Sequence, residues 1–91
     1  MIIETLIIIG TLSALACLTL SRIKSWLRSR SSATRVGDLV KRELNDGRVE
    51  IIAIGLTDNG IQTGKKTWTT KSLDPELDSA FGYSNYARIR V

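Results

Sequence analysis

Three short patterns in this 91-residue sequence contain residues whose types and spacing could do chemistry. The first is Gly64-Lys65-Lys66-Thr67, which matches a phosphate-binding loop only in part. Such a loop needs Gly-Lys-Ser/Thr with another glycine five residues earlier. Here a second lysine intervenes and Gly60 is one residue too close. The pattern therefore does not predict a nucleotide site.

The other two patterns are equally incomplete. Ser21-Arg22-Ile23-Lys24 has the Ser-x-x-Lys spacing of some acyl-enzymes but lacks their companion motifs. Asp74, Glu76 and Asp78 alternate like the ligands of a calcium loop, but Pro75 intrudes and no glycine occupies the sixth position. We interpret the first pattern as chance and the acidic residues as the cap of a helix.

The residues that are missing exclude much of the remaining chemistry. The chain has no histidine, which rules out Ser-His and Cys-His nucleophiles and every imidazole ligand. Its one cysteine, Cys17, cannot form an internal disulfide, a structural zinc site or an iron–sulfur site alone. We therefore predict that the protein is not an enzyme and uses no metal or cofactor.

The elements that must carry any function begin with an apolar stretch. Residues 2–20 contain a single charge, Glu4, close to the start. As a helix they would be about 28 Å long, which is close to the roughly 30 Å of a bilayer core. Only residues 36–91 remain to bury such a helix, and they are too few to surround it. The sequence therefore predicts a transmembrane helix over residues 1–21.

A basic juxtamembrane segment is predicted over residues 22–35. It holds five basic residues and no acid, whereas residues 36–91 hold eight of each. This asymmetry places the N-terminus outside and the C-terminus in the cytoplasm, or in the equivalent position on an internal virion membrane. We expect anionic lipid headgroups to contact the basic residues and the neighbouring tryptophan, namely Arg22, Lys24, Trp26, Arg28, Arg30 and Arg35.

A stripe of small residues runs along the predicted span. Gly10, Ala14, Cys17 and Ser21 fall within about 60° of one another on a helix. Small side chains let a second helix approach closely in lipid. The stripe therefore predicts a helix-packing face whose partner is a second copy or another transmembrane protein.

Residues 36–91 are predicted to form a small α+β domain. Val36, Leu39, Val40 and Leu44 have helical spacing, which favours a helix, although a strand remains the alternative because a hairpin turn follows. Further along, the pattern predicts strands over 49–57, 61–70 and 86–91 and a short helix from Asp74 to Gly82. In the last strand, alternate residues should share a face.

The predicted fold class is therefore a single transmembrane α-helix followed by a small, β-rich α+β cytoplasmic domain. The alternative is a small all-β, barrel-like domain after the helix. The corresponding function is a non-catalytic, single-pass accessory or structural subunit of a membrane assembly, such as a virion membrane-to-shell linker. The alternative function is a membrane-tethered module that binds nucleic acid or a soluble protein. Nucleic acid is not the expected partner, because residues 36–91 carry no net charge.

Overall fold

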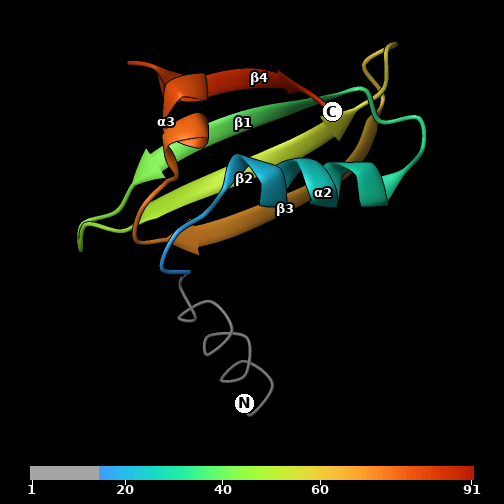
Figure 1. The fold of residues 1–91 in the computed structure, drawn as a ribbon. Helices are drawn as coiled ribbons and strands as arrows, with labels where there is room; N and C mark the ends of the chain where they lie inside the picture. Colours follow the sequence, from blue (N-terminus) through green and yellow to red (C-terminus); the bar gives the residue numbers. More distant parts are fainter. Residues whose placement is uncertain (1–14) are drawn as a thin grey trace, which may run out of the picture.

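The computed structural model describes residues 15–91, which form a small β-rich domain with two short helices (Figure 1). Its four strands make one antiparallel sheet in the order β3-β2-β1-β4. In chain order the elements are α2 (Leu20–Arg30), β1 (Val36–Glu43), β2 (Val49–Leu56), β3 (Gln62–Thr70), α3 (Pro75–Phe81) and β4 (Tyr86–Arg90).

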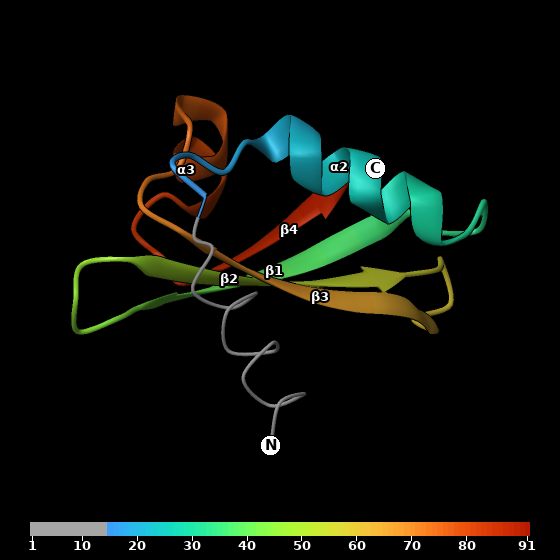
Figure 2. The ribbon, with the colours of Figure 1, turned by 90° about the horizontal axis from the view of Figure 1, so that it is seen from below.

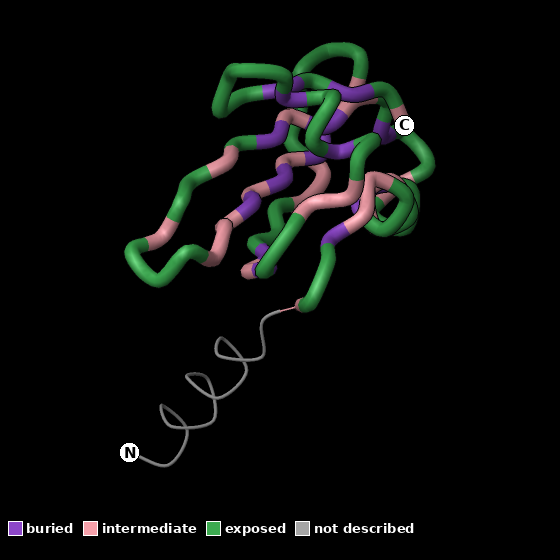
Figure 3. The backbone as a smooth tube through the Cα atoms, turned by 60° about the vertical axis from the view of Figure 1, so that its left-hand side comes forward, coloured by how far each residue is buried: buried purple, intermediate pink, exposed green. Residues whose placement is uncertain are grey.

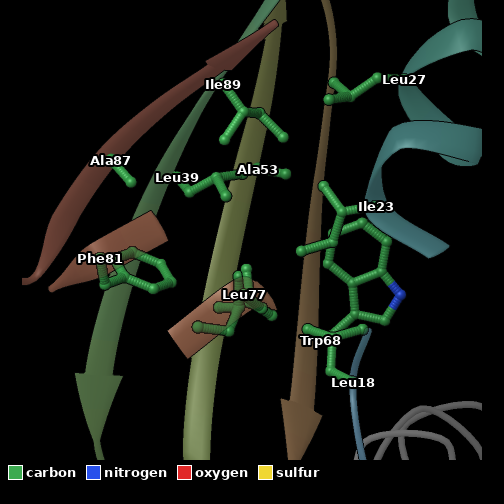
Figure 4. Close-up of a cluster of buried hydrophobic side chains, with 11 residues drawn as sticks. Leu18, Ile23, Leu27, Leu39, Ala53, Trp68, Leu77, Phe81, Ala87 and Ile89 are labelled. Carbon is green, nitrogen blue, oxygen red and sulfur yellow. The ribbon is translucent and has the colours of Figure 1, made fainter. Parts of the chain in front are cut away.

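Both helices cover the same face of the sheet, and no element of residues 15–91 covers the opposite face, which we call the open face (Figure 2). Along β2 and β4, buried residues alternate with more exposed ones (Figure 3), as the period of two in a strand requires. The buried side chains of the strands meet those of the helices in one core (Figure 4). Its members are Leu18, Ile23, Leu27, Leu39, Ile51, Ala53, Trp68, Leu77, Phe81, Ala87 and Ile89.

The structure confirms several of the predicted elements. The strands β2, β3 and β4 and the helix α3 lie within the predicted ranges. In β4, Ala87 and Ile89 are buried whereas Tyr86, Arg88 and Arg90 are exposed. The helix α3 begins as expected, because the Asp74 side chain accepts a hydrogen bond from the Leu77 amide.

The predicted helix over residues 36–45 is wrong, because this segment forms the strand β1. It pairs with β2 on one side and with β4 on the other. Leu39 points into the core, whereas Val36 and Val40 lie on the open face. A strand that places apolar residues on both faces produces spacings that also fit a helix, and pairing with distant strands decides between them.

The predicted transmembrane helix is also corrected. Residues 15–19 are not helical, because Leu15 and Leu18 form parallel bridges to Thr70 and Leu73. Leu18 is fully buried in the core of the domain. Within residues 15–91, no helix is both long enough and apolar enough to cross a bilayer. This finding contradicts the predicted single-pass architecture and the localisation and orientation that depended on it.

Two further points of the predicted architecture have a definite outcome. The barrel-like alternative is wrong, since the sheet is open and β3 and β4 lie at its two edges. Residues 22–30, for which a basic segment beside a membrane was expected, belong to α2 and pack on the sheet through Ile23 and Leu27. Gly10 and Ala14 of the small-residue stripe lie outside the described residues.

Candidate binding surface

One basic side chain from α2 and one from β3 lie over two tryptophans at one edge of the sheet. The ring centroids of Trp26 on α2 and Trp68 on β3 are 5.6 Å apart, and their planes are nearly perpendicular. The guanidinium carbon of Arg30 lies 5.5 Å from the Trp26 ring centroid, and the Lys66 Nζ lies 5.2 Å from that of Trp68. We call Arg22, Trp26, Arg30, Lys66 and Trp68 the α2–β3 surface.

A glycine beneath α2 allows these side chains to approach. A Cβ atom at Gly64 would lie only 2.8 Å from Arg30 Cδ and 2.9 Å from Arg30 Cγ. Because Gly64 has no side chain, the stem of Arg30 lies against β3 and its guanidinium reaches the face of Trp26. The sheet therefore fixes the position of a cation that would otherwise be mobile at the end of a helix.

The exposed side of α2 above β3 is rich in hydrogen-bond donors. An open hollow there is lined by Arg22, Trp26 and four hydroxyl residues, namely Thr19, Ser21, Ser25 and Ser29. The Ser29 hydroxyl already donates its proton to the Trp26 carbonyl over 2.6 Å, whereas the Thr19 hydroxyl accepts from the Arg22 amide over 3.1 Å and keeps its own proton for a ligand. Guanidinium and hydroxyl groups are suited to binding a carboxylate or a phosphate.

No acidic side chain neutralises this surface within the described part of the chain. The helix α2 contains four basic residues and no acid. The ion pairs among residues 15–91 involve Arg35, Arg42, Arg48 and Arg88. Arg22, Arg30 and Lys66 therefore present their charges without a carboxylate partner in residues 15–91.

At the opposite edge of the sheet, one of the two arginines of β4 is neutralised internally. Arg88 on β4 donates two hydrogen bonds to Asp38 on β1, at 2.6 and 3.0 Å, and the Tyr86 hydroxyl donates a third at 3.0 Å. The Arg88 hydrogen bond is the main cause that holds the pKa of Asp38 below its ordinary value, and the Tyr86 hydrogen bond adds to it. The Asp38–Arg88 pair is therefore satisfied, whereas Arg90 on the same strand has no acidic partner in residues 15–91.

The open face of the sheet is partly apolar. Ile52, Ile54 and Leu56 of β2 lie along its centre and are partly exposed, and Val40 of β1 is 39% exposed. An ion pair of 2.8 Å between Arg42 and Glu50 crosses the same face. Exposed aliphatic side chains are common on folded proteins, and nothing on this face selects a particular partner.

The structure separates the residues predicted from the sequence. Cys17 is exposed in the extended segment before α2, and Ser21 is exposed within α2, so one helix does not align them. Lys24 and Arg28 point about 100° or more away from Ile23, on the opposite flank of α2 from Arg22. Arg35 follows the helix and donates to the Ser32 carbonyl. The predicted contact of these cations with lipid headgroups stays a prediction.

Lys66 and Trp68 belong to the site but carry no signal of it in the sequence. Trp68 lies 42 positions after Trp26, and only the folding of α2 onto β3 brings the two rings together. No protein family, curated protein or solved structure matches this chain.

Proposed function

We propose that this protein is a non-catalytic binding module that holds an acidic surface of a partner protein against its α2–β3 surface. The observation that carries the proposal is the set of cations and hydroxyl groups that lack a carboxylate partner within residues 15–91. Such a module would serve as an accessory or structural component of a larger assembly.

The chemistry of the surface favours carboxylates as the groups that are bound. Arginine presents its donors in a planar fork that matches the two oxygens of a carboxylate. Arg22 and Arg30 lie two helical turns apart on the same side of α2, so they can engage successive acidic residues of a partner. Cation–π contacts hold Arg30 and Lys66 in place, which reduces the entropy lost on binding.

A protein fits this surface better than a nucleic acid. Proteins that bind single strands offer aromatic faces on which bases stack. Here a cation already lies over each tryptophan ring, and Trp68 is only 6% exposed. Lys65 and Lys66 lie at one edge of the sheet and Arg88 and Arg90 at the other, so they do not line one continuous groove.

The test uses two variants of the full chain that remove equal charge from the same helix. One variant carries Arg22→Gln and Arg30→Gln, and the matched control carries Lys24→Gln and Arg28→Gln. The probe is a fluorescent, capped heptapeptide of alternating glutamate and valine, titrated at about 150 mM salt and followed by anisotropy. At this ionic strength, charges more than about 8 Å apart are largely screened, so position should matter more than net charge.

We expect the first variant to bind the peptide about tenfold more weakly, since two contacts of about 0.7 kcal/mol each are lost. The control variant should remain within about twofold of the natural protein. Equal losses of affinity in the two variants would show that net charge alone explains the binding. That result would contradict the proposal. Micromolar binding of mixed-sequence single-stranded DNA with a steep salt dependence would instead identify a nucleic-acid partner.

A further inference from the structure

We propose that the acidic partner binds as an extended strand along the outer edge of β3, so that the sheet continues into the partner. This inference rests on the proposed function and specifies how the same site is used. Strand addition to a sheet edge is a common way to bind a peptide, in which the main chain supplies affinity and the side chains supply specificity.

The edge of β3 already accepts a neighbouring main chain at its C-terminal end. The Leu15 amide donates to the Thr69 carbonyl over 2.9 Å, and the Lys71 amide donates to the Leu15 carbonyl over 2.8 Å. The backbone groups of Thr69 and Lys71 therefore point away from β2. Because this direction alternates along a strand, the amide and carbonyl groups of Lys65 and Thr67 point the same way.

Within residues 15–91, no backbone group pairs with these outward-pointing amide and carbonyl groups of Lys65 and Thr67. β3 is an edge strand, and its bridge to Leu15 lies at Thr70. The stretch from Lys65 to Thr67 has no strand beside it within residues 15–91. At about 3.3 Å per residue, this stretch is about 10 Å long and can pair with about three residues of an added strand.

The side chains around the edge specify what an added strand must carry. Alternate side chains of such a strand would lie on the helix-covered face, beside Lys66 and the cations of α2, Arg22 and Arg30. Carboxylates fit those positions. The intervening side chains would lie on the open face beside Lys65 and Thr67, where β-branched residues pack well across strands.

The same lysines argue against a second copy of this chain as the occupant. Edge lysines oppose pairing between identical strands, because the like charges would be brought together. The residues from Gln62 to Thr70 include Lys65 and Lys66 and no acid. An acidic strand turns this repulsion into attraction, so the edge is selective.

The experiment measures amide hydrogen exchange by NMR in the ¹⁵N-labelled full chain, with and without the glutamate–valine heptapeptide. We expect exchange at Lys65 and Thr67 to slow at least about tenfold when the peptide saturates the protein. The control amides are those of Arg88 and Arg90 on β4, which also point away from the sheet because the Val91 amide donates towards Arg35 on the other side. They should not change.

Two further peptides sharpen the test, each N-methylated at alternate residues but in opposite phase. Only the phase that blocks the hydrogen bonds to β3 should abolish binding. If binding depends on Arg22 and Arg30 but leaves Lys65 and Thr67 unprotected, strand addition is overturned while the proposed function stands. Protection at Arg88 and Arg90 overturns the choice of edge. A peptide that does not bind, or that binds regardless of the α2 cations, overturns both proposals.

Discussion

The two edges of this sheet carry basic side chains but treat their charge in opposite ways. At β4, Arg88 is bonded to Asp38 and their charges cancel, which leaves Arg90 as the basic residue of that strand without an acidic partner in residues 15–91. At β3, Lys66 is held over Trp68 and Arg30 over Trp26, and no acid accompanies them in the described part of the chain. An ion pair neutralises the charge of a cation. An aromatic ring holds the cation in position but leaves its charge available to an acidic partner. The difference indicates which edge is built to receive an acidic partner.

The strongest way to break this comparison is to remove the aromatic support of β3. Trp68→Ala should lower the free energy of unfolding by about 3–5 kcal/mol, because a large, buried side chain is lost from the core. Urea denaturation of the full chain measures the loss. Tyr86→Ala on β4 is the control, since that side chain is 49% exposed and should cost about 1 kcal/mol or less. Equal costs would contradict the conclusion that Trp68 supports the β3 edge from within the core whereas Tyr86 lies outside it.

A smaller change moves the Arg30 side chain without removing a side chain from the core, so its effect on binding can be measured apart from the stability of the domain. Gly64→Ala puts a methyl group where the Arg30 stem lies, so the guanidinium must leave the Trp26 ring. The contact is worth about 0.5–1 kcal/mol, and we expect about threefold weaker binding of the acidic peptide. Ser79→Ala, at an exposed position on α3 away from this surface, is the control in the anisotropy titration. Unchanged affinity in Gly64→Ala would show that the placement of Arg30 is irrelevant.

The smallest expected effect concerns the neutralised edge at low pH. The pKa of Asp38 is lowered in the folded protein, so its carboxylate stabilises the fold above the ordinary aspartate pKa. That contribution is lost as the pH falls from about 4 through the lowered pKa. Urea unfolding between about pH 6 and pH 2 should therefore depend less on pH in Asp38→Asn than in the natural protein. If the free energy of unfolding changed with pH by the same amount in both proteins, the Asp38–Arg88 pair would add nothing to stability.

The sequence predicted the elements whose patterns are local. The alternation of Tyr86 to Val91 and the cap at Asp74 identified β4 and α3 because neighbouring residues alone determine those features. These elements need no knowledge of distant contacts.

The remaining errors come from contacts between distant residues. The sequence analysis assigned Leu15 and Leu18 to an apolar transmembrane span. In the structure they pack against the end of β3 and the segment after it. The cations of α2 were identified from the sequence, but their charge alone could not show that Trp26 would meet Trp68. Val36 and Val40 were assigned to a helix because β1 carries apolar residues on both faces, which produces a spacing that also fits a helix. In each case the pairing of strands or the docking of α2 decided the outcome.

The most direct test of the account uses the two tryptophans of the chain, because both belong to the α2–β3 surface. Their indole N–H groups give two separate signals in a ¹H–¹⁵N spectrum, which can be followed as the acidic peptide is added. We predict that both indole signals and the amides of Arg22, Arg30 and Lys66 shift with one affinity, while the amides from Tyr86 to Arg90 stay in place. Shifts centred on β4 with unmoved indole signals would contradict the claim that the edge without internal neutralisation is the binding edge.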